Sequence, residues 1–189
     1  MYRDWGGKDQ PAFWQQKEKI SRTIDFVFEG SNGIWGADDD TDIEYIYQHL
    51  LYINKTSKLT GKQIRDGWLK HIKNEEENFL WVSNQRALDL MINGIVPPNT
   101  SDPKNNPDFD MIDAQLTTEI FGFYSPSSPN FAIKMAELPI QTTARFNAEW
   151  ISKFYVSMYS LAANPDPKLS IKDNLLIIAE KSRDQLPND

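Results

Sequence analysis

The chain has 189 residues with 20 basic and 27 acidic side chains, and its net charge of -7 argues against non-specific nucleic-acid binding, which would need a basic face. The same charge disfavours attachment to an anionic membrane surface. Because the chain has no cysteine, disulfides, thiolate metal sites and cysteine nucleophiles are excluded, and two histidines are too few for a three-histidine zinc centre. Any bound metal ion would therefore need oxygen ligands.

The length fits one domain, which we assign to residues 1–189. The longest purely aliphatic run, at residues 175–179, is far shorter than the roughly 20 residues that a membrane span needs. The first five residues do not form an apolar signal-peptide core. These features favour a soluble protein and, slightly, a cytoplasmic location.

Apolar side chains recur every three or four residues along most of the chain, which is the pattern of amphipathic helices. Thr60 and Ser170 are candidate N-caps, and Gly94 is a candidate C-cap. The predicted helices cover residues 42–51, 60–72, 81–92, 111–121, 146–163 and 171–179. Strict alternation of apolar and polar residues, which is the pattern of a β-strand, never extends beyond a few residues. We therefore predict a compact, orthogonal all-α domain of about seven helices.

Three segments rich in proline and asparagine interrupt the helical pattern, at residues 97–109, 124–130 and 164–170. The first, PPNTSDPKNNPDF, is long for a connection inside a helical domain. Long ordered loops are often functional, so this one could close over a ligand. The alternative is an ordinary surface connection.

The most informative stretch is GIWGADDDTDIE at residues 33–44, where five carboxylates fall within seven residues at the start of a predicted helix. Acidic side chains near a helix N-terminus are favourable by roughly 0.3–1 kcal/mol each. Three consecutive aspartates repel one another, however, and a hard cation such as Mg²⁺ would neutralise them. An EF-hand is excluded because Ile43 and His49 would occupy the glycine and glutamate positions of its loop. The spacing alone leaves capping and metal binding open.

The segment GIWGADDDTDIEYIYQHLL resembles the first acidic motif of the ADP-ribosylglycohydrolases, a family of all-α hydrolases. Four more segments resemble the family's longer bacterial branch in the same order: TGKQIRDGWLKHI, WVSNQRALDLMINGIVPP, NPDFDMIDAQLTTEIFGFYSP and NAEWISKFYVSMYSLAA. The resemblance covers residues 30–185. It implies hydrolysis of the bond between the anomeric carbon of ADP-ribose and a protein side chain or small acceptor.

The resemblance also implies a Mg²⁺ site, with two ions in many members of the family. The ligands would be Asp38, Asp39, Asp40 and Thr41, with Asp39 and Asp40 in the catalytic role. In such a mechanism the metal ions position the ribose diol and help to generate the attacking water. The substrate would be an ADP-ribosylated protein or a ribosylated small molecule.

Five further residues are candidates for binding the substrate: Trp35, Asp113, Gln115, Asn147 and Glu149. Trp35 could stack on an adenine or a ribose, although burial is the usual fate of a tryptophan. The resemblance implies that Asp113 and Gln115 face the cleft, whereas a solvent-facing position is the ordinary expectation. Glu149 near the start of the longest predicted helix could line the site or act as an N-terminal acid.

Two motifs at the ends of the family are not found: a glycine- and acid-containing motif in residues 1–29, and a second Asp-x-Asp-Thr before Asp189. The chain therefore resembles the interior of the family, and we expect a complete site to need residues from outside it. One alternative is a catalytically silent module that binds ADP-ribose or a partner on the same scaffold. A second is a helical glycan-binding protein, which would present its abundant aromatic side chains in a groove.

Overall fold

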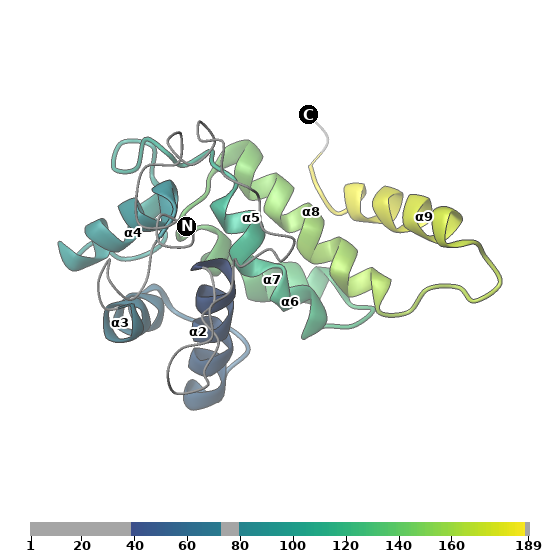
Figure 1. Ribbon diagram of the computed structural model, residues 1–189, viewed down its shortest axis with the longest axis horizontal. Helices are drawn as coiled ribbons and strands as arrows, with labels where there is room; N and C mark the ends of the chain where they lie inside the picture. The colour runs from purple at the N-terminus through teal and green to yellow at the C-terminus, as the bar shows by residue number, and fades with distance from the viewer. Residues whose placement is uncertain (1–38, 73–79, 188–189) are drawn as a thin grey trace, which may run out of the picture.

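The computed structural model describes residues 39–72 and 80–187, and these ranges are all-α, as the hydrophobic periodicity predicts (Figure 1). The elements are α2 (Asp39–Asn54), α3 (Gly61–His71), α4 (Val82–Ile92), the 3-10 helix η1 (Asn99–Ser101), α5 (Asp113–Thr118), α6 (Ile120–Phe123), α7 (Pro129–Ile140), α8 (Phe146–Ala162) and α9 (Ile171–Arg183). With α5 and α6 counted as one interrupted helix, the described ranges contain seven α-helices and no strand.

Three predicted caps are confirmed. Thr60 forms a capping box with Gln63: its Oγ1 accepts from the Gln63 backbone N–H at 3.2 Å, and its own N–H donates to Gln63 Oε1 at 2.8 Å. Ser170 Oγ accepts from the Asp173 N–H at 3.1 Å at the start of α9. Gly94, just beyond α4, has a φ of +91°, a conformation that glycine adopts at little cost.

Two features differ from the predicted helices. Helix α7 does not appear among them, because two of its five buried residues are alanine and a third, Pro139, is a residue that usually breaks a helix. The predicted helix at 111–121 is divided between α5 and α6. The Ile120 N–H donates to Glu44 Oε1 of α2 at 3.0 Å rather than to the carbonyl four residues back, so a contact between helices accounts for the break.

Helix α8 lies at the centre of the fold and packs against α5, α6, α7 and α9. On the other side of α5, α2 packs against both α5 and α3, and α4 packs against α3 and α5. The rings of Tyr47, Trp68 and Phe121 are fully buried where α2, α3 and α6 meet. Tyr47 lies between the other two, with ring centroids 6.4 Å from Trp68 and 5.7 Å from Phe121. Aromatic side chains therefore fill the core on this side of the molecule.

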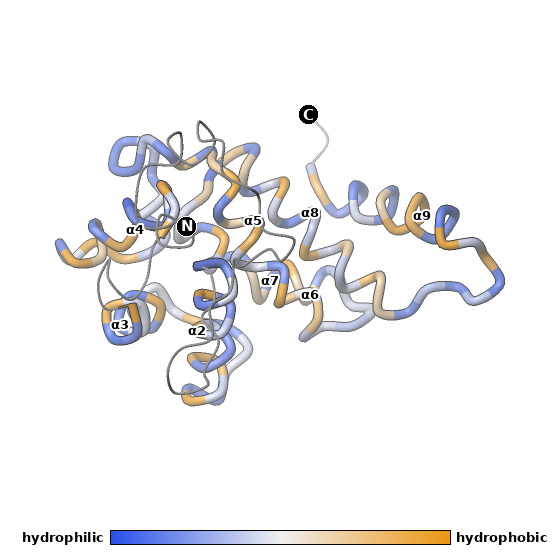
Figure 2. Tube along the Cα trace, in the orientation of Figure 1, coloured by the Kyte–Doolittle hydropathy of each residue, from blue (hydrophilic) through white to orange (hydrophobic). Residues whose placement is uncertain are grey.

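Helix α9 lies at the edge of the fold, beyond α8 (Figure 1). It buries Ile178 and leaves other apolar side chains exposed, Ile171 by 82% and Leu176 by 54%. Figure 2 shows these hydrophobic positions alternating with hydrophilic ones along the helix. None of the helices in the described ranges is both long enough and apolar enough to cross a bilayer.

Candidate functional site

Asp39, the first residue of α2, lies on the buried side of that helix. It precedes Ile43 and Ile46 by four and seven residues, so the three side chains share one face. The carboxylate is 5% exposed, and its Oδ2 accepts from the Trp81 N–H at 2.9 Å and from Asn84 Nδ2 at 3.3 Å. This central residue of the acidic motif therefore joins the start of α2 to the start of α4.

Asp113, the first residue of α5, reaches the same end of α4. The residue at the N-cap position of α4 is Trp81, whose side chain has no acceptor for the free N–H groups of the first turn. Asp113 supplies the missing acceptor: its Oδ1 accepts from the Ser83 N–H at 3.2 Å and from the Asn84 N–H at 3.1 Å. Asp113 is 2% exposed, so the ordinary expectation of a solvent-facing carboxylate is wrong.

Among the residues that the structure describes, N–H groups rather than charged side chains face the two carboxylates. Burial raises the pKa of Asp39 above its ordinary value and the charge of Asp113 adds to the shift, while the N–H donors of Trp81 and Asn84 oppose it. Within residues 39–72 and 80–187, no lysine, arginine or histidine forms an ion pair with either carboxylate. The N–H groups at the N-terminus of α4 supply the positive potential that faces them.

Two buried side-chain oxygens of the residues that these carboxylates contact have no hydrogen-bond partner, Ser83 Oγ and Asn84 Oδ1. Both residues are fully or almost fully buried. Such groups are uncommon in folded proteins, because an unpaired buried oxygen loses its water without a replacement. The N-terminus of α4 is therefore a polar centre with two carboxylates and two unused neutral oxygens.

The other predicted metal ligands lie near Asp39 in sequence but are oriented differently. Asp40 is half-buried and Thr41 is exposed, because successive helical residues point about 100° apart. Asp38 and Trp35 lie outside the described residues. Among the residues that the structure describes, no three acidic or histidine side chains form a group that could hold a metal ion. The predicted metal site therefore stays a prediction.

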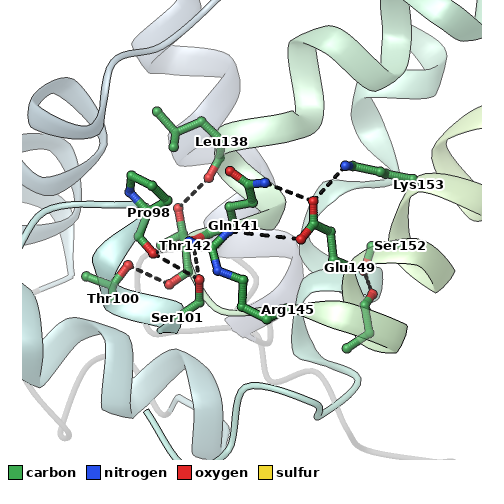
Figure 3. A network of polar contacts seen from close by, with 11 residues as sticks. Pro98, Thr100, Ser101, Leu138, Gln141, Thr142, Arg145, Glu149, Ser152 and Lys153 are labelled. Carbon is green, nitrogen blue, oxygen red and sulfur yellow. Dashed lines mark hydrogen bonds and ion pairs between the residues drawn. The ribbon is translucent and has the colours of Figure 1, made fainter. Parts of the chain in front are cut away.

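Glu149 belongs to a second polar network, at the start of α8 (Figure 3). Its Oε1 accepts from Lys153 Nζ at 2.6 Å and from Gln141 Nε2 at 2.8 Å, and its Oε2 lies 4.0 Å from a guanidinium nitrogen of Arg145. The side chains of Glu149 and Lys153 are about nine-tenths buried. Lys153 Nζ also lies 4.6 Å from the centre of the Trp150 ring. These partners give Glu149 a structural role.

The long loop at 97–109 connects the two polar centres. Asn106 Nδ2 donates to the Ser83 carbonyl at 3.4 Å and to the Thr100 carbonyl at 3.2 Å. Thr100 Oγ1 donates to the Thr142 carbonyl at 2.7 Å, and Ser101 Oγ to the Gln141 carbonyl at 2.5 Å, as Figure 3 shows. Thr100, Ser101 and Asn106 are all buried. The loop is therefore a fixed connection packed against the turn between α7 and α8.

Of the remaining candidates, Gln115 is half-buried and Asn147 is exposed at the surface. Sequence reasoning did not select Ser83, Asn84 or Lys153. One signal was available: a tryptophan at the start of a predicted helix cannot cap it, so an acceptor has to come from another element. The identity of that acceptor cannot be read from the local sequence.

Comparison with family models, with curated proteins and with solved structures finds no match to this chain.

Proposed function

We propose that this protein is a Mg²⁺-dependent hydrolase of the ADP-ribosylglycohydrolase type, which cleaves an N- or O-ribosyl bond of ADP-ribose. One observation carries the proposal. Three segments that resemble the family meet at one point: the acidic motif through Asp39, the WVSNQR segment through Asn84, and the IDAQLTTE segment through Asp113. Polar residues that are buried together from distant parts of a sequence are typical of a functional site.

The two buried carboxylates at this point offer the oxygen ligands that a hard divalent cation prefers, and the described residues add no third acidic or histidine ligand to them. Magnesium prefers carboxylate and other oxygen ligands, and a positive ion would compensate two buried carboxylates that have no described cationic partner. The residues that would hold it are Asp39 and Asp40, with Asp38 and Thr41 beside them. When bound, such an ion polarises a substrate oxygen and lowers the pKa of bound water.

The chain's own residues contribute orientation and charge. Two hydrogen bonds fix Asp39 Oδ2, so its carboxylate cannot rotate freely, and this orientation suits a ligand that has to hold one geometry. The negative charge of Asp39 and Asp40 would stabilise the oxocarbenium-like transition state of ribosyl hydrolysis. Glu149, a candidate for substrate binding, has its Oε1 engaged by Lys153 and Gln141.

A second candidate is a catalytically silent module that binds ADP-ribose or a partner on the same scaffold. It is favoured by the capping of α4: Asp39 and Asp113 together accept three backbone N–H groups, which is sufficient reason for a fold to keep both. On this view the carboxylates stabilise α4 and no ion is needed.

The release of ADP-ribose separates the two candidates. The protein is incubated with arginine-linked and serine-linked ADP-ribosyl peptides in Mg²⁺ or in EDTA, and free ADP-ribose is measured by chromatography. We expect Mg²⁺-dependent release, at the low level that an incomplete site supports, and we expect the double variant D39N/D40N to lose it. The variant D66N serves as the control, because Asp66 is an exposed carboxylate paired with Lys62. Binding of ADP-ribose without release from either peptide would refute the hydrolase and support the silent module.

A further inference from the structure

The loop at residues 163–170 joins α8 to α9 (Figure 1), and a cavity of about 480 Å³ lies between this loop and the two helices. Sites for small molecules have volumes of roughly 300–1,000 Å³. Apolar side chains form much of the wall: Leu161, Pro165, Pro167, Leu169, Ile177 and Ile178. None of the lining residues belongs to either polar centre described above, so the proposed hydrolase gives this cavity no role.

The loop side of the cavity is held in place by one side chain of α9. Asn174 Nδ2 donates to the Asp166 carbonyl at 2.9 Å and to the Ser170 carbonyl at 3.1 Å. Asn174 Oδ1 accepts from the Asp166 N–H at 2.8 Å. Both polar atoms of this amide therefore fix the loop to the helix. A wall that is already formed loses little conformational entropy when a ligand binds.

Two opposite charges line the cavity, and they lie at different ends of it. Asp166 is at the Asn174 end, because its backbone bonds to the Asn174 side chain. Lys181 follows Asn174 by seven residues in α9, so it lies on the same side of the helix and roughly 10 Å further along its axis. Ile177 and Ile178 lie between these two points.

These two charges do not compensate each other. Among the residues that the structure describes, neither Asp166 nor Lys181 forms an ion pair. Asp166 Oδ1 accepts from the Lys168 N–H at 2.9 Å, which leaves the negative charge of the carboxylate in place. The cavity therefore presents an anion at one end, a cation at the other, and an apolar wall between them.

We infer that this cavity binds an elongated zwitterion, a molecule whose ammonium and carboxylate groups are separated by an apolar spacer. The ammonium contacts Asp166, the carboxylate contacts Lys181, and the spacer covers Ile177 and Ile178. A compact zwitterion cannot reach both charges at once, since they are two helical turns apart. This inference does not depend on the proposed hydrolase.

The test is a ligand titration of the isotope-labelled full chain, followed by the NMR shifts of its backbone amides. The probe is ε-aminohexanoate, and the matched ligands are hexanoate and hexylamine, which keep the apolar chain and one charge each. An exposed ion pair contributes up to about a factor of five in affinity. We therefore expect ε-aminohexanoate to bind about fivefold more tightly than either matched ligand, with the largest shifts in residues 164–181.

Two variants assign the ends of the ligand. K181M keeps the apolar stem of the lysine, so it should weaken ε-aminohexanoate and hexanoate about fivefold and leave hexylamine unchanged. D166N keeps an oxygen for the Lys168 N–H, so it should weaken ε-aminohexanoate and hexylamine and leave hexanoate unchanged. The control is K172M, because Lys172 lies on the opposite side of α9 from Lys181 and its loss should change none of the three affinities.

The pattern of affinities decides the matter. A cavity whose structure alone has been damaged would lose all three ligands together, so equal weakening of the three in K181M or D166N would overturn the inference. So would ε-aminohexanoate that binds no more tightly than hexanoate and hexylamine, or that causes no shifts in residues 164–181.

Discussion

The contact between α6 and α8 depends on Gly122, and the variant G122A tests how closely these helices pack. A Cβ atom at this position would lie 2.5 Å from the Val156 carbonyl oxygen, 2.6 Å from Tyr159 Cβ and 3.0 Å from the Ser160 nitrogen. Because two of these are backbone atoms of α8, the helices themselves have to move apart. Ordinary carbon contacts lie near 3.5–4 Å, so the required separation is about 1 Å.

The expected cost follows from this displacement. Over-packing in a close-packed core costs about 1–3 kcal/mol, and a gap approaching 1 Å forfeits up to half of the dispersion energy along the contact. The helix-propensity gain from glycine to alanine is at most about 1 kcal/mol, and α6 has only four residues in which to realise it. We therefore expect a loss of about 2 kcal/mol in the free energy of unfolding, which for a chain of this size lowers the melting temperature by about 4–8 °C.

Urea unfolding followed by circular dichroism measures this loss, and G67A is the matched control. A Cβ atom on Gly67 would lie 2.5 Å from Leu50 Cδ1 and 3.0 Å from Leu50 Cγ, so it meets a side chain and not the backbone of a neighbouring helix. Gly67 also lies inside the 11-residue helix α3, where alanine raises helix propensity. The variant G67A should therefore remain within about 1 kcal/mol of the wild type. A G122A protein as stable as the wild type, or less harmed than G67A, would refute this account of the packing.

Two further predictions concern buried titratable groups. The single variant K153M should lose about 3 kcal/mol of stability in urea unfolding, because it leaves the buried Glu149 carboxylate without its closest cation. The double variant E149L/K153M should lose less, since the buried pair is removed together and only Arg145, whose side chain is 20% exposed, loses a partner 4.0 Å away; equal losses in both proteins would contradict this. Burial, with the charge of His49, holds the pKa of His71 below its ordinary 6.5. Below about pH 6.5, His71 takes up a proton more readily in the unfolded chain than in the folded one. The contribution of neutral His71 to the free energy of unfolding is therefore complete above about pH 6.5 and is lost as the pH falls below that value. Thermal melts between pH 7.5 and 5.5 should show a smaller decrease for H71L than for the wild type, and parallel curves would count against the assignment.

Local sequence determined the helices and several of their ends, because hydrophobic period and capping chemistry act over a few neighbouring residues. The spacing of Ile43, Ile46 and Leu50 places α2, and Thr60 with Gln63 starts α3 without help from the rest of the fold. The acidic motif singled out Asp39, and the family resemblance singled out Asp113. Neither could show that they meet, because 73 residues separate them and only the packing of α2 and α5 brings them together.

Tertiary structure decided what the local pattern left open. The break between α5 and α6 follows from the Glu44 carboxylate of α2, and the cap of α4 comes from Asp113 rather than from its own N-cap residue. The pair of Glu149 and Lys153 is visible in the sequence as an i, i+4 spacing, but its burial depends on how α8 packs on the neighbouring helices. Periodicity determines which side of a helix is apolar. The partner of a polar group on that side comes from another helix, so it depends on how the helices pack in the folded chain.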